Sequence, residues 1–146
     1  MRDAGTITAV AVSGGVDSLY ALASLKEAGE NIFALHARML PPELAPAGYE
    51  AMLERLARAC ASLGVPLSVI DCVEAFAASV IDPFVRAYAG GTTPNPCAHC
   101  NVSIKFGLLL DEARRLGAGR IATGHYFRLE HGPARTALFA GQDPLK

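Results

Sequence analysis

The feature that most constrains this chain is a change of hydrophobic period around residues 9–18, AVAVSGGVDS. Residues 7–12 place apolar side chains among small alanines, which is typical of a strand buried on both faces of a parallel sheet. From residue 19 onward leucines recur at helical spacing, and Gly29 stands where a helix-ending glycine is expected. The sequence therefore predicts two glycines in the turn between a buried strand and an amphipathic helix.

This turn has the composition of an anion-binding site. Glycines let the backbone approach a ligand closely, and a helix start offers unpaired N–H groups with roughly half a positive elementary charge. Ser13 and Ser18 add hydroxyl donors. Asp17 would repel a bare phosphate, so its presence favours a magnesium ion between the carboxylate and the phosphates. The alternative is a tight strand-to-helix turn in which Asp17 only favours the helix dipole.

The composition fits one α/β domain without a secretory or membrane signal. The chain has 146 residues, of which 51% are hydrophobic, and this suits a sheet covered on both faces. Its net charge of −1 gives no general support for a nucleic-acid partner. We see no secretory leader, and no apolar run approaches the roughly 20 residues of a membrane span. We therefore expect a cytoplasmic protein whose four cysteines are core residues, metal ligands or reactive thiols.

Strands alternate with helices along the chain, and this order predicts an α/β fold with one doubly wound, mostly parallel sheet. Strands are expected at residues 7–12, 32–35, 65–71 and 120–124, with a hairpin at 126–130 and 135–140. Helices are expected at residues 19–28, 49–63, 74–80, 83–88 and 104–116. The break between the third and fourth helices is placed at Asp82-Pro83, interpreted as an N-cap followed by a proline in the first turn.

For three residues the sequence allows either a role in the ligand site or a structural role in packing. His36 ends the second strand, at the sheet edge where ligands bind, so it either contacts a nucleotide or, as we favour, has no catalytic role. Cys60 falls within the apolar stripe of a helix and is expected to be a buried structural thiol. Cys72, at the carboxyl end of the third strand, is a candidate for the site, although packing is the favoured interpretation.

Residues 91–101, GTTPNPCAHCN, form the second distinctive stretch. Its prolines and asparagine prevent regular structure, so the thiols of Cys97 and Cys100 are expected on a loop or at a helix start. A thiol at a helix start loses its proton more easily, and the thiolate is both the nucleophile and the metal ligand. A zinc ribbon would need a second cysteine pair. The spacing alone leaves a metal site, a redox pair and sulfur chemistry open.

The hexapeptide SGGVDS resembles the pyrophosphate loop, or PP-loop, of the ATP pyrophosphatase superfamily, whose members adenylate a substrate and release pyrophosphate. It lacks the lysine of a Walker loop and the third glycine of a dinucleotide fingerprint. Residues 90–128 are similar, nearly position for position, to the central segment of the tRNA-specific 2-thiouridylases, with the shared motifs TPNPxxxCN, IKF and ATGHY. The resemblance covers essentially the whole chain. It implies a Rossmann-like PP-loop fold of the adenine nucleotide alpha hydrolase type.

The resemblance implies a role for individual residues. ATP would be bound by Ala11, Val12, Ser13, Gly14, Gly15, Val16, Asp17, Ser18, Ala37 and Gly124. Within this set Asp17 would bind Mg²⁺, Ala37 would line the adenine pocket and Gly124 would lie against the nucleotide. The target base, the wobble uridine of tRNA, would meet Asn95, Pro96 and Cys97. Cys97 and Cys100 would be catalytic, and Cys100 matches a family cysteine that is nucleophilic or forms a disulfide in turnover. Lys146 matches the start of a tRNA-contacting segment.

Cys97 departs from the family pattern, because many members carry Asp at this position. A cysteine here favours a [4Fe-4S] cluster held by Cys97, Cys100 and a third cysteine, while a persulfide route stays open. In the family the third cysteine lies beyond residue 146, and so do the central and C-terminal tRNA-binding domains. We therefore expect residues 1–146 to be the PP-loop ATP pyrophosphatase domain of a longer enzyme.

The reaction implied by the resemblance is ATP-dependent tRNA thiolation. ATP would adenylate O2 of the uridine with release of pyrophosphate, and sulfur would then displace AMP to give 2-thiouridine. The implied partners are tRNA and a sulfur donor, namely a desulfurase with relay proteins, and the high apolar fraction suggests a homodimer. Two alternatives remain: another PP-loop adenylating enzyme, and a non-catalytic module that binds ATP or an iron–sulfur cluster.

Overall fold

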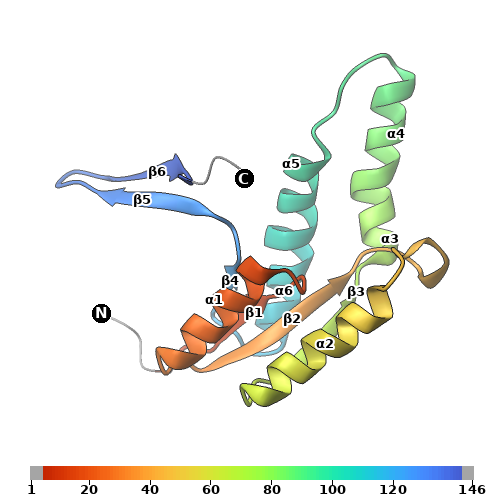
Figure 1. The fold of residues 1–146 in the computed structure, drawn as a ribbon. Helices are drawn as coiled ribbons and strands as arrows, with labels where there is room; N and C mark the ends of the chain where they lie inside the picture. The colour runs from red at the N-terminus through yellow and green to blue at the C-terminus, as the bar shows by residue number, and fades with distance from the viewer. Residues whose placement is uncertain (1–4, 143–146) are drawn as a thin grey trace.

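The computed structural model describes residues 5–142, and its central element is a four-stranded sheet of order β3-β2-β1-β4. The strands are β1 (Thr8–Ala11), β2 (Ile32–Arg38), β3 (Leu67–Asp71) and β4 (Arg120–Thr123). All neighbouring strands in this sheet are parallel. The chain runs outward from β1 to β2 and β3, and then returns to place β4 on the other side of β1 (Figure 1). This reversal makes a topological switch point between β1 and β4, which is where ligands bind in open parallel sheets.

Helices cover both faces of the sheet, so the predicted doubly wound α/β fold is confirmed. Helices α1 (Val16–Glu27) and α2 (Tyr49–Ser62) pack on one face. The other face carries two longer helices, each made of three consecutive elements. The first joins α3 (Val73–Phe76), η2 (Ala77–Ile81) and α4 (Asp82–Ala89). The second joins α5 (Pro96–Cys100), η3 (Asn101–Leu108) and α6 (Leu109–Arg115).

The core is divided into two clusters by the sheet. Successive residues of β1 point to opposite faces, so Ala9 belongs to the cluster under the two longer helices and Val10 to the cluster under α1 and α2. Both residues are fully buried, as expected for a central strand of a parallel sheet. Cys60 is buried in the second cluster and Cys72 in the first, which confirms that both thiols pack in the core.

The predicted break at Asp82-Pro83 is wrong, because the helix continues through it from residue 73 to residue 89. Asp82 has helical angles, with φ −61° and ψ −44°. A proline inside an α-helix removes one hydrogen bond and its ring clashes with a carbonyl of the preceding turn. Here the turn before Pro83 is the π-helical η2, whose wider i→i+5 spacing displaces those carbonyls. The helix therefore accommodates the proline instead of ending at it.

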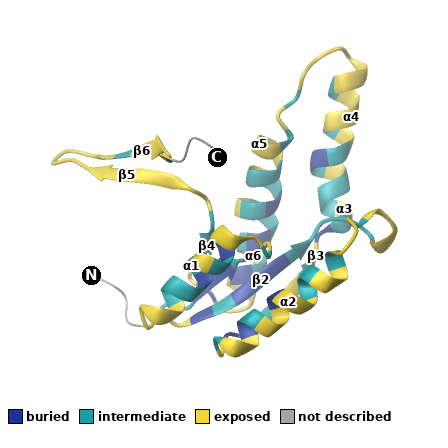
Figure 2. Cartoon of the chain, viewed as in Figure 1, coloured by how far each residue is buried: buried dark blue, intermediate teal, exposed yellow. Residues whose placement is uncertain are grey.

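The last elements form a hairpin that stands apart from the main sheet. Strands β5 (Phe127–His131) and β6 (Thr136–Ala140) pair antiparallel, close to the predicted hairpin, and project from the end of β4 (Figure 1). Most of the hairpin is exposed (Figure 2). Leu129 and Leu138 are direct partners on one face of the hairpin. On the other face the guanidinium carbon (Cζ) of Arg128 lies 5.1 Å from the centre of the Phe139 ring.

Within the part of the chain that the structure describes, no helix is long and apolar enough to span a membrane. A short 3₁₀ turn, η1 (Pro42–Leu44), lies inside the proline-rich stretch between β2 and α2 that was expected to be a loop.

Candidate functional site

The candidate site is a pocket of about 470 Å³ at the carboxyl edge of the sheet. This volume lies within the usual range of small-molecule sites. The residues that line it and were singled out from the sequence are Ala11, Val12, Ser13, Gly15, Asp17, Ser18, His36, Ala37 and Gly124. They come from the ends of β1, β2 and β4 and from the start of α1. The structure thus brings two motifs that are far apart in the sequence, SGGVDS and ATGHY, to one cavity.

The loop between β1 and α1 is held by the side chain of Ser18. Its hydroxyl donates to the Gly15 carbonyl oxygen at 2.9 Å and accepts from the Ser13 amide at 3.2 Å. Ser18 is buried, whereas the Ser13 and Asp17 side chains lie on exposed residues that face the pocket. The sequence predicted two hydroxyl donors for a ligand. In the structure the Ser13 hydroxyl lies 3.3 Å from the Ser18 hydroxyl and accepts from the Gly15 amide at 3.4 Å, so both hydroxyls brace the loop, and both residues line the pocket.

Glycine is required at two positions around this loop. Gly14 has φ +85°, a left-handed conformation that side-chain-bearing residues rarely adopt. Gly124 is closely surrounded by backbone, since a Cβ built on it would lie 2.6 Å from the Ser18 amide nitrogen. Gly14 and Val16 belong to the loop but do not line the pocket.

His36 connects the end of β1 to α2. Its Nδ1 lies 2.8 Å from the Val12 carbonyl oxygen and its Nε2 lies 2.9 Å from the Tyr49 hydroxyl. A carbonyl only accepts, so Nδ1 carries the proton and, in the neutral ring, Nε2 accepts from Tyr49. His36 is buried and also lines the pocket. Both of its ring nitrogens therefore have partners within the protein.

The pocket wall beyond β2 is apolar and was not anticipated from the sequence. It is formed by the chain after β2 and by the start of α2, with the residues Met39, Leu40, Ala45, Pro46, Tyr49 and Met52. The signal that could have revealed this wall is the proline-rich stretch 41–46, which keeps apolar side chains outside regular structure. The site therefore pairs a polar loop with a hydrophobic surface.

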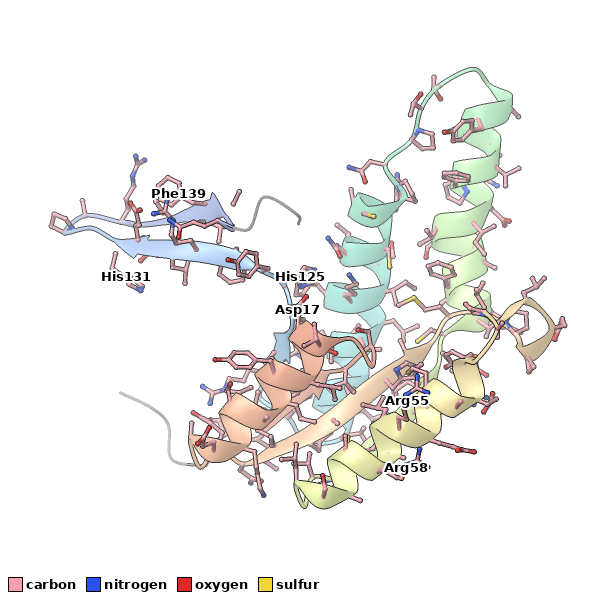
Figure 3. The ribbon with its side chains drawn as sticks, in the orientation of Figure 1. Asp17, Arg55, Arg58, His125, His131 and Phe139 are labelled. Carbon is pink, nitrogen blue, oxygen red and sulfur yellow. The ribbon has the colours of Figure 1, made fainter. Side chains whose placement is uncertain are left out.

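The remaining side of the pocket carries basic and polar groups. Lys105, from η3, and His125, just after β4, both line it. Asp17 and His125, both labelled in Figure 3, come from segments far apart in the sequence and line the same pocket. His125 Nδ1 lies 2.6 Å from the Thr123 hydroxyl, and its ring stacks on Phe106. Burial lowers the pKa of His125, and the nearby Lys105 ammonium lowers it further. The sequence had placed Lys105 within a shared motif without a role.

The cysteine pair lies at a helix start, as predicted. Asn95 is the N-cap of α5, where its side-chain oxygen accepts from the Ala98 amide at 3.2 Å. Cys97 is exposed and Cys100 is half-buried against the core cluster that contains Cys72. Asn95, Pro96, Cys97 and Cys100 do not line the pocket.

The expectation of an acidic thiol at this helix start is not met at Cys100. Burial raises the pKa of the Cys100 thiol, while Lys105 acts to lower it and Cys97 to raise it. Desolvation disfavours the thiolate and is the largest cause of the shift. Burial also raises the pKa of Cys72, to about 11, with smaller contributions from Asp71, Glu112 and Cys100.

The described residues do not provide a complete metal site. Among residues 5–142 no group of three or more His, Cys, Asp or Glu side chains could hold a metal ion. Cys97 and Cys100 could give two ligands, whereas a [4Fe-4S] cluster takes about four. Asp17 faces the pocket as a single carboxylate, which fits a Mg²⁺ that keeps waters and binds phosphates as well. Lys146 lies outside the described residues.

Comparison with known proteins gives consistent matches over most of the chain. The family model described as the tRNA methyl transferase HUP domain matches residues 6–146. The tRNA-specific 2-thiouridylase MnmA of Nitratidesulfovibrio vulgaris strain Miyazaki F is 51% identical over 140 residues, which cover 94% of this chain and 40% of that protein. The protein of the same name from Thermus thermophilus is 43% identical, with coverage of 94% and 40%. The chain thus spans about 40% of the length of the curated relatives it matches.

A solved structure shares the fold. The U34-tRNA thiolase NcsA from Methanococcus maripaludis, determined with its [4Fe-4S] cluster, matches with a TM-score of 0.57. The match covers 83% of this chain and 39% of that chain at 21% sequence identity. At this identity the likeness shows a common fold.

Proposed function

We propose, since this chain belongs to the tRNA methyl transferase HUP domain family, that it is the ATP-binding part of an enzyme that makes 2-thiouridine in tRNA. The observation that carries the proposal is the pocket itself. A glycine loop at a helix start lies on one side of it and an apolar wall on the other, as a nucleotide with charged phosphates and a flat base requires.

The residues around the pocket divide naturally between the parts of ATP. Residues 11–18 would hold the phosphates, because the start of α1 and the Ser13 hydroxyl face the cavity. Gly124 closes the loop from β4 and would leave the backbone free to approach the phosphates. Ala37 and the apolar wall beyond β2 would enclose the adenine. Mg²⁺, when bound between Asp17 and the phosphates, would offset their negative charge.

The proposed chemistry begins with attack of the uridine 2-oxygen on the α-phosphorus of ATP. An O–P bond forms, the bond between the α- and β-phosphates breaks, and pyrophosphate leaves. A sulfur nucleophile then bonds to C2 of the uridine, and AMP leaves with the former 2-oxygen. Where the nucleophile is a cysteine persulfide, a second cysteine thiolate then attacks the carrier sulfur, the S–S bond to the transferred sulfur breaks, and 2-thiouridine and a cysteine disulfide result. The loop would contribute preorganised N–H groups to the charge that develops on the phosphates.

We place the cysteine pair and its N-cap on the tRNA side of this reaction. Asn95, Pro96 and Cys97 would meet the target base, and Cys97 and Cys100 would be the thiols of sulfur transfer. Their position at the start of the helix that carries Lys105 into the pocket, with Cys97 exposed, supports this arrangement. A [4Fe-4S] cluster here would need ligands from outside the described residues.

The chain's length relative to its relatives limits what it would do alone. We propose that residues 1–146 are one PP-loop domain of a cytoplasmic enzyme whose tRNA-binding parts lie elsewhere, with Lys146 among the tRNA contacts. The sulfur would come from a desulfurase through relay proteins. The exposed apolar residues of the hairpin would be covered in a larger assembly, such as a homodimer.

The first test is ATP binding by calorimetry in the presence of Mg²⁺. Wild-type chain is expected to bind ATP, and Asp17→Asn is expected to lose most of the Mg²⁺-dependent part of the affinity. Asp111→Asn is the matched control, because Asp111 is an exposed carboxylate on α6 outside the pocket. Failure of the wild-type chain to bind ATP, or an Asp17→Asn variant that binds like wild type, would contradict the proposal.

Two further measurements address turnover and sulfur. Exchange of labelled pyrophosphate into ATP that depends on tRNA would support adenylation, whereas binding without exchange would favour a non-catalytic ATP-binding module. Iron and sulfide assays on anaerobically purified wild type and Cys100→Ala distinguish the routes of sulfur. Iron that is lost in the variant indicates a cluster. Because further cluster ligands would come from outside the described residues, iron-free protein leads to the same assay on the full-length enzyme, where absence of iron indicates thiol chemistry.

A further inference from the structure

Lys105 is the single lysine or arginine among the described residues that line the pocket. Asp17 is the single carboxylate among them. A triphosphate carries several negative charges, and the amides of the loop approach it from α1 only. The side chain of Lys105 reaches the cavity from η3, on the opposite face of the sheet from α1. The pocket therefore has a second source of positive charge on a different wall.

The π-helical form of η3 explains how Lys105, which lines the pocket, also lies near Cys100. Lys105 follows Cys100 by five residues, and in an α-helix that spacing would place the two side chains roughly 140° apart. A π-helical turn closes i→i+5 hydrogen bonds, which brings residues five apart onto nearly the same side. In agreement, Lys105 acts electrostatically on both Cys100 and His125.

Gly107 permits this wider turn. A Cβ built on Gly107 would lie 2.8 Å from the carbonyl oxygen of Val102, the residue five positions earlier. This contact is closer than real side chains show, so a substitution would force the backbone of η3 to shift. Gly107, two residues after Lys105, is thus required for the turn that positions Lys105.

We propose that Lys105 binds the α-phosphate of the nucleotide and makes the pocket select phosphorylated adenine nucleotides over adenosine. This inference rests on the proposed function, since it takes the pocket to be an ATP site. The α-phosphate is the group that remains in both ATP and AMP. Lys105 and His125 line the pocket together with the glycine loop, and we assign the terminal phosphates to the loop and the α-phosphate to Lys105.

The test compares the binding of ATP, AMP and adenosine by calorimetry with wild type, Lys105→Gln and Lys105→Arg. We expect Lys105→Gln to weaken ATP and AMP binding by a similar factor, roughly tenfold to hundredfold, because one charge-assisted contact is lost. Adenosine binding should not change, and this also shows that the variant is folded. Lys105→Arg should recover part of the affinity, since it keeps the charge. Lys26→Gln, an exposed lysine at the end of α1, is the matched control.

Gly107→Ala gives a second, independent test. It leaves the charge in place but disturbs the turn that aims it, so it is expected to weaken AMP binding while adenosine binding persists. Unchanged AMP and ATP affinities in Lys105→Gln would overturn the role of Lys105 and leave the proposed function standing. An equal loss of adenosine binding in that variant would also overturn it, by showing a structural role. A wild-type chain that binds no ATP would overturn both proposals.

Discussion

Gly124 lies against Ser18 with no room for a side chain between them. A Cβ on Gly124 would lie 2.6 Å from the Ser18 amide nitrogen and 2.8 Å from the Asp17 carbonyl carbon. Both neighbours are backbone atoms at the start of α1, so they cannot move aside as a flexible side chain would. The contact links β4 directly to the glycine loop, across the switch point of the sheet.

This contact predicts that Gly124→Ala separates β4 from the loop. The variant is expected to lose about 1–3 kcal/mol of unfolding free energy, because backbone must shift to admit the methyl group. It should also bind ATP more weakly than wild type. Urea unfolding and calorimetry measure the two effects. Gly90→Ala is the control, since a Cβ there meets only ordinary contacts at 3.4–3.5 Å, and equal stability of the two variants would contradict the prediction.

The bracing of the loop by Ser18 gives a second prediction. Ser18→Ala removes the donor to the Gly15 carbonyl and the acceptor of the Ser13 amide, and it should lower the unfolding free energy by about 1–3 kcal/mol. Ser62→Ala serves as the control, because the Ser62 hydroxyl also donates to a backbone carbonyl but is exposed. Urea denaturation of both variants tests this. A Ser18→Ala variant no less stable than Ser62→Ala would show that the bracing is unimportant.

The bridge made by His36 gives a third prediction. His36→Ala is expected to cost about 2–3 kcal/mol, since it leaves the Val12 carbonyl and the Tyr49 hydroxyl without this partner. Tyr49→Phe removes only one of the two bonds and should cost about 1 kcal/mol. Denaturation measures both costs, and nitrogen NMR of the ring tests the proton on Nδ1. A proton on Nε2 alone would rule out the bridge as described.

The buried thiol of Cys72 predicts a loss of stability at alkaline pH. The pKa of Cys72 is raised to about 11 in the folded chain, so between about pH 9 and 11 the unfolded chain ionises first. The protonated Cys72 thiol makes its full contribution to the unfolding free energy below pH 9. This contribution falls by about 2 kcal/mol as the pH rises toward 11. Wild type and Cys72→Val are compared by urea denaturation across this range. The variant should show a shallower decline, and parallel curves would refute the assignment.

The sequence predicted the sheet and its ligand edge because local pattern and global fold agree there. The apolar run ending in Gly14-Gly15 and the small residues at Ala122 and Gly124 each indicate a buried strand followed by a close approach. Parallel strands bring their carboxyl ends to one edge, so the two motifs had to meet. The burial of Cys60 followed from its place in the stripe of α2 in the same way.

The errors arose where hydrogen bonding departs from the α-helical pattern. Pro83 was expected to start a new helix, because a proline inside an α-helix disrupts the i→i−4 hydrogen bonds. The η2 turn before Pro83 is π-helical and does not have these bonds, so the helix continues. Lys105 received no role because the sequence pattern does not show that η3 is π-helical or that this residue lines the pocket. The raised pKa of Cys100 depends on burial by residues distant in sequence, which a local motif does not reveal.

The pairing of β4 with β1 also sets the order in which the pocket can form. Arg120 donates to the Thr8 hydroxyl across 112 residues of sequence, and the strands containing them are direct neighbours. Pairing between residues so distant in sequence costs loop-closure entropy before the contacts that offset this cost have formed. We therefore expect β4 to pair with β1 late in folding. A nascent chain that has emerged only to β3 already contains the glycine loop, but not the strand that closes it. Nucleotide binding during synthesis would therefore report completion of the whole sheet.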